Sequence, residues 1–225
     1  YVSFFWYFIF MNNLPNQFFY SKKEDRLNVL SHGLGFILSI IGLIFLINKG
    51  LQNFNLTYFM SLLIYGLSLS TMYIASTLYH NSKTANSRYN LRMFDMISIY
   101  ILIAGSYTPF TLILLKDNQG WLLFTIIWLL AFFGIAWKIF TVGKYNLVTT
   151  SLYIFMGGLW LFFYESFVNQ IPSDALWWIT AGCLTYLAGV IFYLLDNKLK
   201  YNHFIWHLFV LAASGCHYIS IYFYI

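Results

Sequence analysis

Charged residues are scarce in this chain. Asp, Glu, Lys and Arg make up 8% of its 225 residues, whereas hydrophobic residues make up 60%. Soluble domains normally carry about 25% charged residues, so this composition excludes one and indicates an integral membrane protein. The chain also has only two cysteines, Cys183 and Cys216, without CxxC spacing. We therefore expect neither a disulfide framework nor a thiolate metal site.

Seven charge-free spans of membrane length occupy nearly the whole sequence. They are predicted at residues 27–48, 50–82, 96–115, 118–137, 145–164, 175–195 and 201–225. Little length remains for a soluble domain, so any chemistry must be built from side chains of the bundle itself. The predicted fold is an all-α bundle of seven transmembrane helices over residues 22–225. Residues 1–21 are predicted to form an interfacial or disordered segment.

Basic residues are distributed unevenly around these spans. Ten of the twelve lie on one side of the predicted bundle, and only Lys49 and Lys116 lie on the other. The positive-inside rule therefore predicts a cytoplasmic N-terminus and an external C-terminus. Because the basic residues stand singly or in pairs at helix ends, they do not form a nucleic-acid-binding face.

Two adjacent glycines, Gly157 and Gly158, lie inside the fifth predicted span. Small residues in membrane helices commonly let a neighbouring helix approach closely. We therefore expect these glycines to permit close helix contact rather than to mark a hinge.

Two histidines, His203 and His207, stand at the start of the last span. At this spacing both side chains leave the same face of a helix, about 5–6 Å apart, as in a helical zinc site. A third ligand would have to come from another helix. His217 lies ten residues after His207, about 15 Å along the helix, which is too far for the same ion. Polar side chains also hold membrane helices together, so the pair alone leaves both roles open.

The predicted topology brings more polar side chains to the depth of this pair. His80 ends the second span, and Asp95 lies near the start of the third, both on the cytoplasmic side. Ser76 precedes His80 by about one helical turn and shares its face. Three histidines from two helices supply the ligand set of a catalytic zinc site, with one position left for water. We therefore predict one Zn²⁺ bound by His80, His203 and His207.

Two further histidines lie outside this ligand set. His32 and Asn28 share a face at the cytoplasmic start of the first span. They either support the metal ligands or form a satisfied pair at a helix end, and the sequence leaves both roles open. For His217 we predict a hydrogen bond between helices instead of metal binding.

Several short motifs carry a family resemblance. They are Glu24-Asp25-x-x-Asn28-x-x-Ser31-His32, Ser76-x-x-x-His80, Asp95 with IAGSYTPF after it, and His203-x-x-x-His207 continuing as LFVLA. In this order they resemble the hemolysin III proteins, a bacterial branch of the adiponectin and progestin receptor (PAQR) family. The resemblance runs from about residue 22 to the end.

This resemblance implies a seven-helix fold with a cytoplasmic N-terminus. It also implies a zinc ion held by the residues matching His80, His203 and His207. In the wider superfamily of membrane hydrolases, the residues that match Ser76 and Asp95 have catalytic roles.

Three classes of function fit these observations. The first is a zinc-dependent, ceramidase-like hydrolase of a lipid amide or ester, which opens to the cytoplasmic leaflet of a bacterial cytoplasmic membrane. In it, Asp95 would act as general base and Ser76 would stabilise the developing oxyanion. The second is a membrane sensor with a structural zinc. The third is a pore-forming or cytolytic protein, as the family name suggests, although no conduction path is evident. The expected partners are a lipid or acyl chain and the membrane, without nucleic acid, and the oligomeric state stays open.

Overall fold

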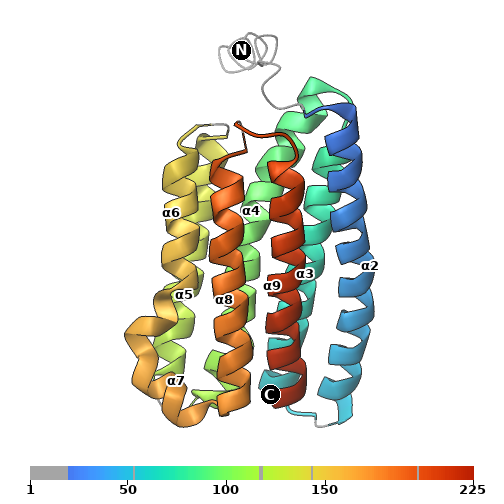
Figure 1. The fold of residues 1–225 in the computed structure, drawn as a ribbon. Coiled ribbons are helices and arrows are strands. Elements are labelled where there is room, and N and C mark those ends of the chain that lie inside the picture. The colour runs from blue at the N-terminus through green and yellow to red at the C-terminus, as the bar shows by residue number, and fades with distance from the viewer. Residues whose placement is uncertain (1–19, 53, 117–118, 143, 197) are drawn as a thin grey trace, which may run out of the picture.

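The computed structural model describes residues 20–52, 54–116, 119–142, 144–196 and 198–225. Within these ranges the chain is helical and contains no strand, and seven helices are long and apolar enough to cross a membrane. They stand side by side in one bundle (Figure 1). The predicted all-α, seven-span fold is therefore confirmed. The interfacial segment predicted at residues 1–21 lies, apart from its last two residues, outside the described part of the chain.

Short connections make successive helices alternate in direction. The elements are α2 (Lys22–Gln52), α3 (Leu56–Asn81), α4 (Ala85–Pro109) with η2 (Phe110–Leu114), α5 (Gly120–Phe140), α6 (Asn146–Gly157), η3 (Leu159–Phe163), α7 (Tyr164–Gln170), α8 (Ser173–Leu194) and α9 (Asn202–Tyr224). The end of α3 and the starts of α2, α4 and α9 consequently meet at one end of the bundle (Figure 1). We call this the amino end, because α2 begins there.

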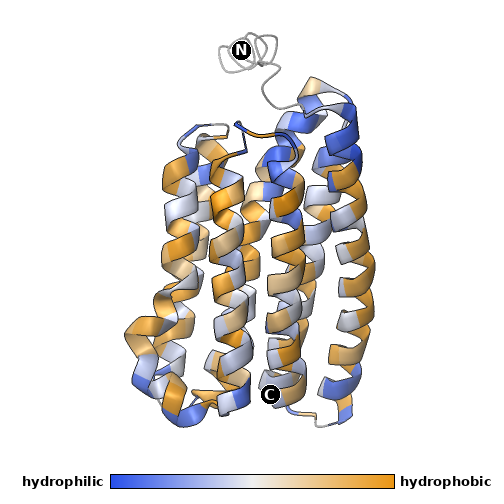
Figure 2. Ribbon diagram, viewed as in Figure 1, coloured by the Kyte–Doolittle hydropathy of each residue, from blue (hydrophilic) through white to orange (hydrophobic). Residues whose placement is uncertain are grey.

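The face that α2 buries differs from the face that it exposes. In α2 the buried residues are small or polar, with the single exception of Leu46, whereas leucines and isoleucines of the same helix are exposed. Figure 2 shows apolar residues along the middle of every helix and hydrophilic ones near the two ends. Lipid tails accept exposed leucine, and small residues let helices approach closely. At Gly42, for example, the Tyr218 hydroxyl donates a hydrogen bond of 2.9 Å to the glycine carbonyl.

The fifth span is interrupted after Gly157. α6 ends there, and η3 and α7 complete the crossing. A side chain at Gly157 would meet no atom within 4 Å, and one at Gly158 would meet only the carbonyl oxygens of Ile154 and Phe155 in the same helix. The expectation that the two glycines permit close contact with another helix is therefore wrong. Gly158 instead ends α6, with its N–H bonded to the carbonyls of Ile154 and Met156. The Tyr107 hydroxyl lies 2.9 Å from the Gly157 carbonyl, and this contact satisfies backbone freed by the break.

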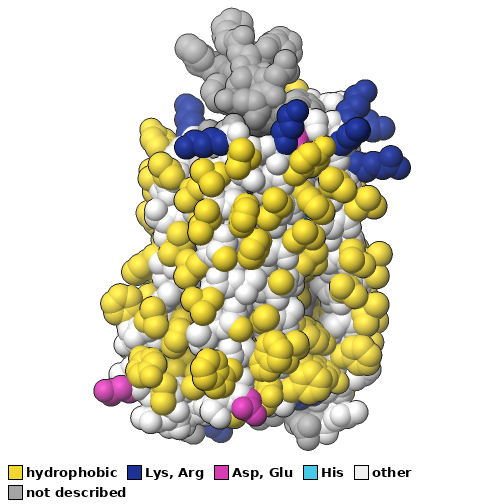
Figure 3. Space-filling model, in the orientation of Figure 1, with side chains coloured by type: hydrophobic (Ala, Val, Ile, Leu, Met, Phe, Trp, Pro, Cys, Tyr) yellow, Lys and Arg dark blue, Asp and Glu magenta, His cyan; other side chains and the backbone are white. Residues whose placement is uncertain are grey.

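Basic side chains gather at the amino end of the bundle (Figure 3). The topology places Lys22, Lys83 and Lys198 there, whereas Glu165 and Asp174 flank the connection at the opposite end. The uneven distribution on which the orientation was predicted is therefore present in the fold. The orientation itself stays a prediction.

Candidate metal centre

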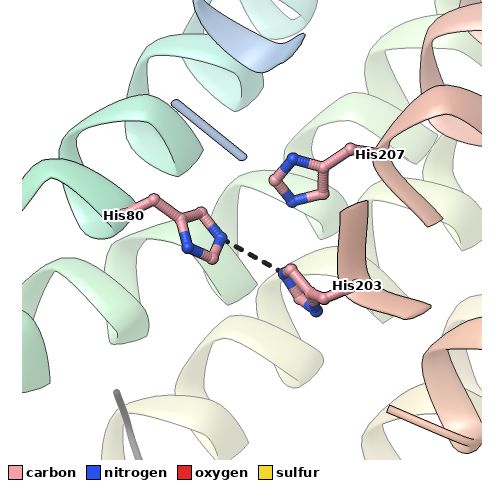
Figure 4. Close-up of side chains that lie close together, drawn as sticks. All are labelled: His80, His203 and His207. Carbon is pink, nitrogen blue, oxygen red and sulfur yellow. Dashed lines mark hydrogen bonds between the residues drawn. The ribbon is translucent and has the colours of Figure 1, made fainter. Parts of the chain in front are cut away.

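Three buried histidines meet at the amino end of the bundle. His80 lies in the last turn of α3, and His203 and His207 lie in the first two turns of α9. Their rings face a common space between the two helices (Figure 4). Each offers a ring nitrogen within 4.8 Å of the others, and the Nε2 atoms of His80 and His203 are 3.2 Å apart. The three residues are thus close enough to hold one metal ion.

The start of α9 is held in place by contacts with its neighbours. Tyr201, which precedes the helix, adopts a left-handed conformation with φ 66°. Its N–H donates a 2.6 Å hydrogen bond to Glu24 Oε1 at the start of α2. Asn202 Nδ2 donates to the Leu195 carbonyl at 2.9 Å. These bonds fix where the first turn of α9, and hence His203, lies against α2.

A buried charge pair orients His80. Its Nδ1 lies 3.2 Å from Asp25 Oδ1 and 3.3 Å from Asn28 Nδ2. Arg88 Nη2 donates to the same carboxylate oxygen at 2.7 Å. An ionised carboxylate only accepts hydrogen bonds and an amide nitrogen only donates them, so Nδ1 can bond Asp25 or Asn28 but not both. We assign the ring proton of His80 to Nδ1 and its hydrogen bond to Asp25. The Nε2 lone pair is then available to a cation.

His203 is oriented by residues that flank the bundle. Its Nδ1 lies 3.2 Å from Asp196 Oδ2 and 3.0 Å from the Tyr20 hydroxyl. Tyr20 donates a 2.6 Å hydrogen bond to the same carboxylate. Burial alone would raise the pKa of Asp196, but hydrogen bonds from His203 and Tyr20 outweigh it, and the pKa is lowered. Asp196 therefore stays ionised and accepts the Nδ1 proton of His203.

His207 is oriented by a hydroxyl group. Its Nδ1 lies 3.1 Å from Ser31 Oγ. The Ser31 hydroxyl donates its own proton to the Asn28 carbonyl at 3.0 Å, so its oxygen accepts from His207. On these contacts we assign the ring proton of all three histidines to Nδ1, which makes Nε2 the candidate ligand atom.

The three histidine rings are arranged so that their nitrogen atoms could coordinate one cation. The 3.2 Å contact between the Nε2 atoms of His80 and His203 is a hydrogen bond only where one of the two atoms carries a proton. With both protons on Nδ1, the two Nε2 lone pairs repel each other unless a positive charge lies between them. Tetrahedral coordination with Zn–N bonds of about 2.0–2.1 Å separates ligand nitrogens by roughly 3.3 Å, which agrees with the observed distance. Imidazole ligands also suit copper, iron and nickel, so the site supports a metal without fixing its identity.

Asp95 and Ser76 lie beside the histidines without joining the metal group. Both line a cavity of about 560 Å³ that His203 and His207 also line. Ser76 interacts with the Asp95 carboxylate, and His203 is near enough to influence it electrostatically. Among the described residues, the group close enough to share one ion consists of the three histidines alone. A carboxylate and a hydroxyl thus face the cavity next to the candidate metal position.

His217 lies apart from this group, further along α9. Its Nε2 contacts Cys183 Sγ of α8 at 3.9 Å, which is the contact between helices that the sequence predicted. The orienting residues Asp25, Asp196 and Tyr20 were not predicted. Asp25 belongs to one of the family motifs, and that motif could have identified it. Asp196 and Tyr20 lie in the short segments before α9 and α2, where no motif or helical periodicity marks them.

Seven membrane-spanning helices around a buried three-histidine cluster define a multi-pass membrane protein with a candidate metal centre. Residues 20–218 match the family model described as haemolysin-III related. Hemolysin-3 from Bacillus cereus is 38% identical over 203 residues, covering 90% of this chain and 92% of that protein. The Hemolysin-3 homolog from Bacillus subtilis (strain 168) is 35% identical over 205 residues, covering 91% and 96%. The chain therefore belongs to the haemolysin III family, as the motifs predicted.

A more distant relative comes from animals. Monocyte to macrophage differentiation factor from Homo sapiens is 32% identical over 171 residues, covering 72% of this chain and 69% of that protein. This match supports the predicted relation to the wider PAQR family.

Proposed function

We propose that this protein is a zinc-dependent hydrolase that cleaves an amide or ester bond of a lipid. One observation carries the proposal: a single cavity of about 560 Å³ is lined by metal-site histidines, by Asp95 and Ser76, and by a long apolar wall. Ligand cavities of about 300–1,000 Å³ that are mostly apolar, with few convergent polar groups, are typical of small-molecule sites.

Each polar residue has a distinct role in this proposal. The histidines hold the ion, and zinc supplies Lewis acidity and makes water nucleophilic at neutral pH. Asp95 accepts a proton from the water as its oxygen bonds to the carbonyl carbon. The Ser76 hydroxyl, which bonds the Asp95 carboxylate at rest, is released as Asp95 takes the proton, and it then donates a hydrogen bond to the carbonyl oxygen as that oxygen becomes negatively charged. Asp95 then returns the proton to the leaving nitrogen or oxygen as its bond to carbon breaks.

The shape of the cavity supports a lipid substrate. Leu161 of η3 and Leu184 and Leu187 of α8 line the cavity, and they are also exposed on the outside of the bundle. The cavity therefore reaches the outer surface between η3 and α8, where acyl chains surround a membrane protein. A chain can enter sideways while its polar group approaches the histidines.

We further propose that the amino end faces the cytoplasm of a bacterium, with the protein in the cytoplasmic membrane. The ten-to-two distribution of basic residues supports this orientation. Reporter fusions to each end test it: alkaline phosphatase at the C-terminus should be active, and green fluorescent protein there should be dark. A C-terminal reporter that is active only in the cytoplasm would reverse the orientation.

The function is tested by release of fatty acid from a lipid amide and a matched lipid ester. The purified protein is placed in vesicles of phosphatidylethanolamine and phosphatidylglycerol, stripped with a chelator, and then reloaded with zinc. We expect release only from the reloaded protein. If reloaded protein releases no fatty acid from either substrate, the hydrolase proposal fails and the zinc-stabilised sensor takes its place.

The printed name of the bacterial relatives, Hemolysin-3, supports cytolysis as the alternative. Leakage of a dye from the same vesicles would favour that alternative. Retention of the dye together with fatty-acid release favours the hydrolase.

A further inference from the structure

A groove lies on the outside of the bundle at its amino end, apart from the cavity that the histidines line. It has a volume of about 300 Å³ and is lined by Lys23, Arg26, Leu27 and Leu30 of α2 and by Tyr201, which immediately precedes α9. None of these five residues lines the cavity beside the candidate metal centre. The groove therefore meets whatever surrounds the protein where α2 and α9 begin.

The two basic side chains of this groove are available to a partner from outside the chain. Lys23 and Arg26 are both exposed, and neither forms an ion pair with a residue that the structure describes. Lys22 and Lys200 are their neighbours or neighbours of Tyr201 in sequence, and Figure 3 shows basic side chains gathered at this end of the bundle. The surroundings of the groove are therefore positively charged.

The two acidic residues between Lys23 and Arg26 in sequence are engaged elsewhere. Asp25 accepts a 2.7 Å hydrogen bond from the buried Arg88. The Glu24 carboxylate accepts the Tyr201 N–H at 2.6 Å through Oε1 and the Ser21 hydroxyl at 2.9 Å through Oε2. Neither carboxylate is paired with the two basic side chains of the groove, which favour an anionic ligand.

An apolar stripe continues from the groove along α2. It consists of Leu30, Leu34, Ile37 and Ile41, which recur every three or four residues and are between 46% and 61% exposed. Leu27 and Ile37 are ten residues apart, about 15 Å along the helix. One leaflet supplies about half of the hydrocarbon core of a bilayer, which is roughly 30 Å thick. The stripe is therefore long enough to cover an acyl chain through one leaflet.

We propose that this groove binds one anionic phospholipid of the surrounding leaflet, such as phosphatidylglycerol. The head group lies at Lys23 and Arg26, and an acyl chain lies along the apolar stripe. Basic residues beside a membrane surface attract anionic lipids, and two of them favour such a lipid over zwitterionic phosphatidylcholine about 10- to 30-fold. The site needs neither metal nor hydrolysis, because the groove is separate from the cavity.

Native mass spectrometry tests this proposal. The purified full chain in detergent is incubated with equal amounts of phosphatidylglycerol and phosphatidylcholine that carry the same acyl chains, and the lipid retained on the protein is identified. We expect wild type to retain one phosphatidylglycerol, with a preference of about 10- to 30-fold. The Lys23→Gln, Arg26→Gln double variant should lose this preference. The Lys23→Arg, Arg26→Lys double variant keeps both charges and should retain it.

The matched control is the Lys83→Gln, Lys144→Gln double variant. It removes two positive charges from the same end of the bundle, in the connections after α3 and α5, which do not line the groove. This variant should keep the preference. Glycerol 3-phosphate, added at an ionic strength matched with sodium chloride, should leave the lipid bound, because it lacks the acyl chain.

Three results would overturn the inference. The first is equal retention of the two lipids by wild type. The second is an equal loss of preference in the two double variants that remove charge, which would indicate a general effect of surface charge. The third is displacement of the lipid by glycerol 3-phosphate, which would assign the groove to a free phosphate ester.

Discussion

The two ends of the cavity use histidine in different ways. At the amino end, each of the three metal-site histidines has its Nδ1 atom held by a residue from elsewhere in the chain. Further along α9, His217 lines the same cavity, contacts Cys183 at 3.9 Å and packs edge-on against Tyr186. Metal-binding histidines almost always have an orienting partner on the second ring nitrogen. These partners, more than the presence of histidine, distinguish a candidate metal centre from a packing contact.

Among substitutions at the amino end of the cavity, Asp95→Asn is expected to have the largest effect on the rate of hydrolysis. Asn keeps the shape of the side chain but cannot accept the proton, so hydrolysis should fall about 10²- to 10⁴-fold. Zinc content should stay at the wild-type level, because Asp95 is outside the metal group. The control is Asp174→Asn, which changes an exposed carboxylate at the opposite end of the bundle. Full activity in Asp95→Asn would exclude Asp95 as the base.

A smaller effect is expected from Ser76→Ala. The loss of one hydrogen bond to the developing oxyanion should lower the rate about 10²- to 10³-fold. Ser39→Ala is the matched control, since Ser39 is also buried but donates to the Phe36 carbonyl of its own helix. The assay is fatty-acid release at saturating substrate. Equal rates for the two variants would remove Ser76 from the mechanism.

Substitution of the two carboxylates that orient the histidines should have a smaller effect than Asp95→Asn or Ser76→Ala. Asp196→Asn weakens the acceptor that holds His203, and Asp25→Asn does the same for His80. Each should lower zinc affinity about 10- to 100-fold, measured by titration against a chelator of known affinity. Asp25→Asn also removes the carboxylate that accepts a hydrogen bond from the buried Arg88, so Asp196→Asn is the cleaner variant.

Cys183→Ala supplies the comparison with the far end of the cavity. It removes the contact of His217 and should leave zinc affinity unchanged. Wild-type affinity in both carboxylate variants would show that the Nδ1 partners do not support the centre.

Much of the fold followed from the sequence, because charge-free length alone determines where helices can cross a membrane. The depth of His80, His203 and His207 also followed, since helix direction alternates and each residue is near a helix end. The break after Gly157 did not follow, because glycine in a membrane helix is compatible with both close packing and a helix end.

The orienting residues were harder to predict for a physical reason. Asp25 and Asp196 lie at helix ends, where charged side chains ordinarily reach toward water. Asp25 turns inward toward Arg88, which lies far from it in sequence. Asp196 turns inward because of the path that the chain takes between α8 and α9. The stacking of the His32 ring on the His207 ring likewise depends on how closely α2 and α9 approach, and helical periodicity does not report that distance.

The most direct test of the account is the metal content of the purified protein, measured together with X-ray absorption at the zinc edge. We expect one zinc per chain, with three imidazole nitrogens at about 2.0–2.1 Å. The zinc should be absent from the His203→Ala, His207→Ala double variant and present in His217→Ala. Wild-type protein without bound metal, or full zinc retention in the double variant, would contradict the assignment of this histidine cluster as a zinc centre.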